Sequence, residues 1–262
     1  GIAMTQATSH ETVFADAIRS RLDQAIAEKR VWNLHGIVVL RRSETMLERY
    51  FDGNDRARGI GYLGRVAFAA YTLHDLRSCS KSIVALLYGI ALERGLVPPP
   101  EAPLFSGFPE YADLANRDGR DRLTIAHMLT MTMGTDWDET SFDYADPRNS
   151  ETAMDAAGDH YRYVLERKVV DTPGAHWTYC GGATALLARL ISKGSGRSLH
   201  EFAREALFDP LRLGPSAWAS GPDGAPYAAS GARMSVRDLA CIGQLVLDGG
   251  RHDGGDRQHR AA

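Results

Sequence analysis

The stretch HDLRSCSKSIVALLYGIALERG, residues 74–95, decides how the rest of the sequence is interpreted. Apolar residues recur in it at helical spacing, which predicts a helix from Ser78 to Arg94 with Gly95 as its C-terminal cap. Ser78 and Lys81 lie three residues apart in the first turn of this mainly apolar helix. Their role is the first question that the sequence poses.

Ser78 and Lys81 have the spacing of a nucleophile and its base. Residues three apart lie on one face of a helix, so the amine of Lys81 can reach the hydroxyl of Ser78. The helix N-terminus favours a negatively charged oxygen, and an adjacent base is a common way to activate a serine. The alternative is structural, because serine is a preferred helix cap and Lys81 would then extend to solvent. The spacing alone leaves both interpretations open, since such pairs also arise by chance.

The composition is that of an ordinary globular protein, with 262 residues of which 44% are hydrophobic and 24% charged. A formal net charge of −3 with scattered Lys and Arg residues gives no basic surface for nucleic acid or an anionic membrane. No apolar run reaches the roughly 18 residues of a membrane span, and residues 4–30 show an amphipathic pattern unlike a secretory signal. The three cysteines are too few for a disulfide framework. We therefore expect a cytoplasmic protein without nucleic-acid or membrane partners.

Hydrophobic periodicity divides the chain into a short α/β part and a longer helical part. A helix over 10–30 precedes two strands, about 36–41 and 45–51, which form a hairpin, and the Gly-rich residues 53–64 are predicted to be a loop. Further helices are predicted over 124–132, 151–168, 183–193, 199–208 and 235–248, with long loops at 101–122, 134–150 and 212–234. Thr124, Ser198 and Ser235 are the expected N-caps, and Gly194 and Gly249 are expected to end the helices that precede them.

The predicted hairpin is a marginal sheet, because two isolated strands need further strands or a packed helix for stability. Unpaired strand edges can also recruit another chain. A homo-oligomer is therefore a possible state of this protein.

The sequence resembles the β-lactamase-related serine hydrolases in five segments that follow the family's order. This family includes class C β-lactamases, DD-peptidases, family VIII esterases and 6-aminohexanoate-dimer hydrolases. LRSCSKSIVALLYGIALERGLV (76–97) is similar to the nucleophile helix and GIVVLRRSETMLERYFDG (36–53) to the opening hairpin. RLTIAHMLTMTMGTDWDE (122–139), the block 173–213 that contains WTYCGG, and GARMSVRDLACIGQLVLDGGR (231–251) are similar to later segments. The resemblance covers about residues 35–252.

The resemblance implies an α+β fold of the β-lactamase/transpeptidase type. Residues 1–262 are then one incomplete domain: 4–75 form the N-terminal helix and hairpin, 76–250 a mainly helical part, and 251–262 a polar tail. Relatives continue with a strand that carries Lys-Thr-Gly or His-x-Gly and supplies part of the oxyanion hole. We expect that strand, and the rest of the sheet, to lie outside this sequence.

The family's second motif, Tyr-x-Asn or a variant, matches Tyr179-Cys180-Gly181. Its tyrosine shares proton transfer with the lysine, so the resemblance makes Tyr179 the third catalytic residue. Gly181 stands where lactam-handling relatives have an asparagine that holds an acylamino group, which favours the esterase and aminohexanoate-hydrolase branch. Gly181, Cys180 and the nearby Trp137 are the expected substrate-binding residues. Cys79 and Cys180 are expected to be small core fillers, and a redox-sensitive pair is the alternative.

The resemblance thus implies a serine hydrolase that acts on an ester or a small amide through an acyl-enzyme on Ser78, with Lys81 and Tyr179 moving the proton. A β-lactamase or DD-peptidase-like activity on a lactam or peptide is the alternative. A catalytically inactive or non-catalytic relative is an alternative of another class. No metal or other cofactor is expected, because His200-Glu201 lacks the second histidine of a zinc-binding pair. Asp136 and Asp138 could form the rim of the cleft, and His74 could adjoin the site.

Overall fold

A computed structural model describes residues 9–252. Most of the predicted polar tail, from residue 253 onward, lies outside the described residues. The α-helices are α1 (Ser9–Ala27), α2 (Cys79–Glu93), α3 (Ile125–Leu129), α4 (Ser150–Ala156), α5 (His160–Leu165), α6 (Gly181–Ser195), α7 (Leu199–Ala203) and α8 (Val236–Leu247). Short 3₁₀ turns are η1 (Leu104–Gly107), η2 (Pro109–Tyr111) and η3 (Arg120–Arg122), and a π-helical turn, η4 (Arg204–Phe208), follows α7. The strands are β1 (Gly36–Arg41), β2 (Glu44–Tyr50), β3 (Asp52–Ala57), β4 (Gly61–Ala67), β5 (His74–Asp75), β6 (Ala217–Trp218) and β7 (Ala232–Met234).

The predicted hairpin is confirmed. β1 and β2 pair antiparallel with Val39 opposite Leu47, and the register shifts after Val39. Arg42 and Ser43 make the connection with positive φ angles of 51° and 68°. Two consecutive left-handed residues match the right-handed twist of the strands that they join.

The prediction of a loop over 53–64 is wrong, because β3 and β4 form a second antiparallel hairpin there. The buried positions of β3 are Gly53, Asp55 and Ala57, so its buried face carries small and polar residues. A strand of this composition has no apolar alternation to reveal it in the sequence.

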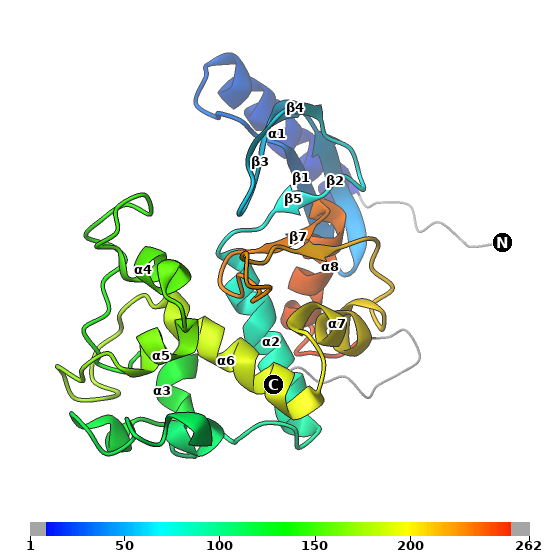
Figure 1. Ribbon diagram of the computed structural model, residues 1–262. Helices are drawn as coiled ribbons and strands as arrows, with labels where there is room; N and C mark the ends of the chain where they lie inside the picture. The colour runs from blue at the N-terminus through cyan, green and yellow to red at the C-terminus, as the bar shows by residue number, and fades with distance from the viewer. Residues whose placement is uncertain (1–8, 253–262) are drawn as a thin grey trace.

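A third sheet, in the order β5-β7-β6, lies next to helix α2. The loop predicted over 212–234 is therefore also wrong, since it contains β6 and β7. His74 pairs with Met234 and Asp75 with Arg233, so the segment that leads into α2 is bound to a strand far along the chain. In Figure 1, β5 and β7 lie between the N-terminal strands and the helical part.

The core is built where α2 packs against α6, and Figure 1 places these two helices at the centre. Helices α3, α4 and α5 pack on one side of α6 and α7 on another. Gly194, predicted as a stop, lies inside α6, which continues to Ser195 and ends at Gly196 with φ +69°. A Cβ at Gly194 would lie 1.9 Å from the Leu96 carbonyl oxygen, so close helix–loop packing explains this glycine.

The predicted N-caps are confirmed, because the side chains of Thr124, Ser198 and Ser235 accept hydrogen bonds from backbone N–H groups of α3, α7 and α8. The single helix predicted over 151–168 is two helices, α4 and α5. Asp159 caps α5 by accepting a bond from the Arg162 N–H, which starts a new helix after Gly158.

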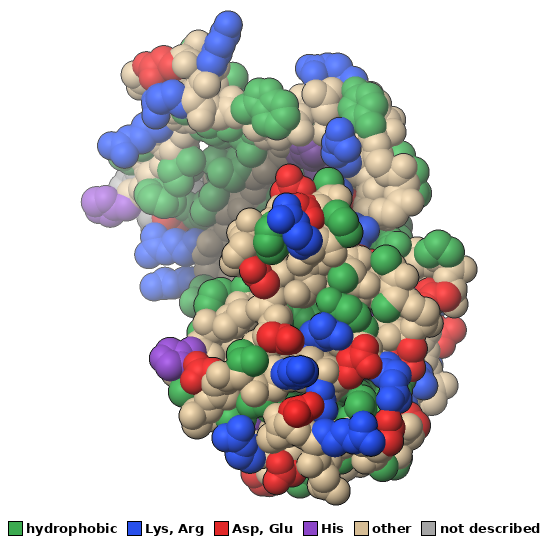
Figure 2. All heavy atoms as spheres, turned by 60° about the vertical axis from the view of Figure 1, so that its left-hand side comes forward, with side chains coloured by type: hydrophobic (Ala, Val, Ile, Leu, Met, Phe, Trp, Pro, Cys, Tyr) green, Lys and Arg blue, Asp and Glu red, His purple; other side chains and the backbone are tan. Residues whose placement is uncertain are grey.

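Acidic and basic side chains are interspersed over the face of the helical part that carries α3–α5 (Figure 2). Several of them form ion pairs across elements, including Arg162 with Asp113 and Lys193 with Glu110. This surface has the mixed charge of an ordinary solvated face.

Candidate active site

A sharp turn between β5 and α2 presents Ser78. Arg77 adopts a left-handed conformation with φ +47°, a strained state for a side chain of this size. The Leu76 N–H bonds to the Ala232 carbonyl at 2.9 Å, and Arg77 pairs with Asp75 at 3.0 Å. Both contacts hold the turn, so Ser78 stands exposed at the helix start.

Lys81 and Tyr179 both reach the hydroxyl of Ser78. Lys81 Nζ lies 3.1 Å and the Tyr179 hydroxyl 2.7 Å from Ser78 Oγ. Ser78 occupies the N-cap position, but its side chain makes no capping bond within residues 9–252. The structure therefore does not support the alternative of a capping Ser78 with an extended lysine.

The amine of Lys81 is further held by the Ala229 carbonyl, to which it donates a bond of 3.0 Å. It also lies 4.7 Å from the centroid of the Tyr179 ring, which in turn packs against Trp177 at 5.9 Å. A ring face attracts a cation, so these contacts fix the positions of the Lys81 and Tyr179 side chains.

Gly181 leaves room for a carboxyl group. A Cβ at this residue would lie 2.6 Å from Glu151 Oε1 and 3.4 Å from Glu139 Oε1. Glu151 comes from the first turn of α4, and Glu139 from the loop before it. The place that a side chain at 181 would take is thus filled by a pair of buried glutamates.

The other two predicted substrate-binding residues lie in the wall behind the site. Trp137 is 4% exposed, donates its indole N–H to Glu139 at 2.9 Å and packs against the Cα of Gly182. Cys180 is 3% exposed, and its Sγ caps α6 by accepting from the Ala183 N–H. Burial raises the pKa of the Cys180 thiol to about 12, so Cys180 is the core filler that was predicted. The same prediction is wrong for Cys79, which is exposed.

A cavity of about 450 Å³ opens beside Ser78. Its lining residues come from four parts of the chain: Arg58, Arg77, Ser78, Tyr144, Glu151, Thr152, Asp155, Tyr227 and Ser230. A second cavity of about 230 Å³ lies behind it and shares Glu151, Asp155, Tyr227 and Ser230 with the first. The shared residues make the two cavities neighbours, and of the two only the first is lined by Ser78.

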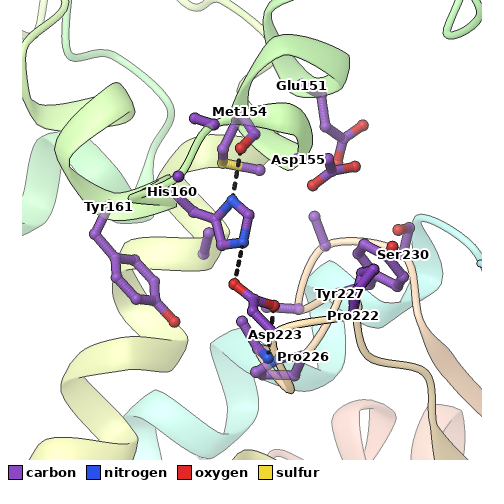
Figure 3. Close-up of a pocket in the computed structure, with 17 residues that line it drawn as sticks. Glu151, Met154, Asp155, His160, Tyr161, Pro222, Asp223, Pro226, Tyr227 and Ser230 are labelled. Atoms are coloured by element: carbon purple, nitrogen blue, oxygen red, sulfur yellow. Dashed lines mark hydrogen bonds and ion pairs between the residues drawn. The ribbon is translucent and has the colours of Figure 1, made fainter.

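Figure 3 shows the second cavity between helices α4 and α5 and the loop 221–230. His160 joins these walls, because its Nδ1 lies 2.6 Å from the Met154 carbonyl and its Nε2 lies 2.6 Å from Asp223 Oδ2. The Glu151 and Asp155 carboxyl groups lie at the border with the first cavity.

Arg58 supplies a positive charge next to the carboxyl groups between the two cavities. It forms an ion pair with Asp155, bonds to Ser230 at 3.1 Å and lies 4.0 Å over the Tyr227 ring. Burial raises the pKa of Asp155, and the charge of Arg58 opposes this effect.

Sequence reasoning missed Glu139, Glu151 and Arg58. Glu151 follows the Asn149 cap, a common place for a glutamate that merely favours a helix start, so its sequence position carries no sign of the site. Arg58 belongs to the hairpin that was predicted to be a loop.

The remaining candidates lie outside this arrangement. His74 is buried in β5, with its Nδ1 3.0 Å from His35 Nδ1, and stacks on Phe68. Asp136 is exposed, whereas Asp138 bonds to the backbone N–H groups of Thr140 and Ser141 and orders its own loop. Across residues 9–252, no cluster of three or more His, Cys, Asp and Glu side chains has the arrangement of a metal site. Within the same range, no helix is both long and apolar enough to cross a bilayer.

The profile of the β-lactamase family matches residues 23–261. This chain belongs to the β-lactamase family. The chain is 26% identical over 252 residues to the 6-aminohexanoate-dimer hydrolase of Paenarthrobacter ureafaciens, an alignment that covers 92% of the chain and 58% of that relative. The chain therefore spans somewhat more than half of the relative's length.

Solved structures show the same fold. A class C β-lactamase superposes with a TM-score of 0.65 at 17% identity, over 93% of this chain and 67% of that one. The octameric penicillin-binding protein homologue from Pyrococcus abyssi superposes with a TM-score of 0.62 at 18% identity, over 89% of this chain and 56% of that one. The predicted α+β fold of the β-lactamase/transpeptidase type is confirmed.

Proposed function

We propose that this β-lactamase-family protein is a serine hydrolase that cleaves a linear amide or an ester through an acyl-enzyme on Ser78. The observation that carries the proposal is the convergence of Lys81 Nζ (3.1 Å) and the Tyr179 hydroxyl (2.7 Å) on Ser78 Oγ. A hydroxyl flanked by two proton-transfer groups is the arrangement that nucleophilic catalysis requires.

In the proposed reaction, Ser78 Oγ attacks the substrate carbonyl while its proton passes to the neutral amine of Lys81. The Tyr179 hydroxyl, bonded to the same oxygen, relays a proton to the leaving amine or alcohol. Water then attacks the acyl-enzyme, the same groups accept its proton, and Ser78 is restored. The Ser78 N–H at the start of α2 is one donor for the developing oxyanion.

The acyl-binding side favours a linear substrate over a β-lactam. Gly181 has no amide group for an acylamino side chain, and Glu151 fills the corresponding space. The cavity of about 450 Å³ beside Ser78 has room for an acyl chain, and a second cavity adjoins it. The relative named 6-aminohexanoate-dimer hydrolase supports the same choice.

Covalent labelling tests this function. The purified chain is incubated with a fluorophosphonate, and intact mass and peptide mapping locate the adduct, with Ser78→Ala as the control and circular dichroism as the test of folding. We expect one adduct, at Ser78, and release of p-nitrophenol from short p-nitrophenyl esters. A folded chain that takes up no label contradicts the proposal. Faster turnover of a chromogenic cephalosporin than of esters and anilides would assign it to the β-lactamases instead.

A further inference from the structure

Glu139 accepts hydrogen bonds from three donors around the second motif. The Trp137 indole and the Gly181 N–H bond to Oε1, at 2.9 Å and 2.5 Å, and the Tyr144 hydroxyl bonds to Oε2 at 2.9 Å. Glu139 is 4% exposed, so these donors replace water. A carboxylate surrounded by donors is satisfied in its ionised form.

Glu151 completes this cluster from the opposite side. It is 7% exposed, its N–H is capped by Asn149, and its carboxyl group lies beside that of Glu139, since a Cβ at Gly181 would lie 2.6 Å from Glu151 Oε1 and 3.4 Å from Glu139 Oε1. Two carboxyl groups can share a hydrogen bond only when one of them carries a proton. Since Glu139 already accepts three bonds, the proton belongs on Glu151.

We propose that Glu151 is a positioning residue of the active site: as a neutral carboxyl group it donates to Glu139, and the pair anchors the backbone two residues after Tyr179. The anchor is the bond between Glu139 and the Gly181 N–H. Because Gly181 has no side chain, the glutamate pair takes over the space and the polar contacts of that position. This inference rests on the proposed function, since it assigns Glu151 a role through Tyr179 and Lys81.

The charges around Glu151 support a bound proton near neutral pH. Burial raises the pKa of Glu151 to about 7, and the carboxylates of Glu139 and Asp155 act in the same direction. Lys81 on α2 opposes them. Arg58 pairs with Asp155 at the cavity border, and the remaining charged lining residue, Arg77, pairs with Asp75. No other positive side chain lines the cavity among the described residues.

Loss of this proton has two consequences for the site. Two carboxylates then face each other in a buried space, which weakens the contact that holds Gly181. A carboxylate also appears near Lys81, and its attraction competes with Ser78 Oγ for the Lys81 amine. The neutral form of Glu151 is therefore the productive one, and its contribution is lost as the pH rises through about 7.

The test compares the rate of Ser78 labelling by a fluorophosphonate from pH 5.5 to 9 in the wild-type chain, Glu151→Gln and Glu151→Ala. The amide of glutamine keeps the donor and the acceptor but cannot ionise. We expect the ratio of the wild-type rate to the Gln variant's rate to fall about tenfold with a midpoint near pH 7, whereas Glu151→Ala is slow throughout. Glu101→Gln, a change of an exposed glutamate, is the matched control and should leave the profile unchanged. A ratio that does not depend on pH overturns the proposal.

A second measurement separates this inference from the proposed function. If wild-type Ser78 takes no label at any pH, the proposed function fails, and ¹³C NMR of the glutamate-labelled full chain then tests the carboxyl pair by itself. A side-chain carboxyl signal that titrates near pH 7 and is missing in Glu151→Gln supports the pair. Its absence from the wild-type spectrum overturns it.

Discussion

The hydroxyl of Ser80 accepts a hydrogen bond of 3.0 Å from the Ala232 N–H, and this contact joins the nucleophile helix to strand β7. Ser80 is completely buried and lies one residue before Lys81. The bond therefore belongs to the framework that aligns Ser78 and Lys81, the proposed catalytic groups.

Replacement of Ser80 by alanine should destabilise the protein by about 1–3 kcal/mol, because the Ala232 N–H would stay buried without a partner. Urea denaturation measures the change. Ser82→Ala removes an exposed hydroxyl from the same helix and serves as the control, with an expected change within about 0.5 kcal/mol. Equal stabilities of the two variants would contradict the role assigned to Ser80.

Lys81→Met should lower the rate of Ser78 labelling by roughly 10²–10⁴-fold, the usual contribution of a general base. Methionine keeps the length of the side chain but removes the amine that contacts Ser78 and Ala229. Lys193→Met removes an amine bound to Glu110 and should react like the wild type. A Lys81→Met variant that is labelled at the wild-type rate excludes this lysine as the base.

Tyr179→Phe should slow labelling at least roughly tenfold with little loss of stability. Phenylalanine keeps the ring that packs against Lys81 and Trp177 and removes only the hydroxyl bonded to Ser78. The comparison uses stopped-flow acylation rates and melting temperatures. An unchanged rate would limit Tyr179 to packing.

Gly181→Asn should destabilise the fold by about 1–3 kcal/mol, because the new Cβ would lie 2.6 Å from Glu151 Oε1. Glu151→Ala should relieve the clash, so the double variant is expected to be more stable than the sum of the two single changes predicts. Chemical denaturation of the four proteins of this cycle gives the coupling energy. Strict additivity would show that the two residues do not compete for one space.

Acid should destabilise the protein through His74. Burial lowers the pKa of His74 to about 4, and the nearby His35 acts in the same direction, so the folded state holds this ring neutral. The unfolded chain binds a proton at the ordinary histidine pKa near 6.5. Stability is therefore complete above about pH 6.5 and falls by an order of 3 kcal/mol as the pH approaches 4. Urea denaturation at pH 7.5, 6 and 5 checks this, and His74→Phe, which keeps the stacking on Phe68, should flatten the dependence.

The sequence predicted those parts of the fold whose signals are local. The apolar spacing of α2, the alternation in β1 and β2, and the caps Thr124, Ser198 and Ser235 all act within a few residues. The sequence did not predict strands β3, β6 and β7. β6 and β7 are short, and β3 has Gly and Asp on its buried face, so these segments become strands only by pairing with their neighbours. The break between α4 and α5 was missed because the pattern of apolar residues continues across it.

The residues of the candidate site also fall into two groups: those that a local sequence pattern predicted and those that only the fold brings together. Ser78 and Lys81 are three residues apart, so a pattern could join them, and Tyr179 was placed only by family resemblance. Glu139 and Glu151 belong to the site through contacts with Gly181, 42 residues after Glu139. Partners so distant along the chain leave no periodicity or spacing that could predict them.

The pairing of β5 with β7 determines when this site can form during synthesis. Asp75 and Arg233, paired across these strands and joined by an ion pair of 2.9 Å, are 158 residues apart in the chain. A ribosome therefore releases Ser78 and Lys81 long before the strand that holds their turn, and the apolar face of α2 has to wait for α6. Contacts between such distant residues form late in folding. A nascent chain that stops before residue 232 would thus contain Ser78 and Lys81 but lack the strand that orients them.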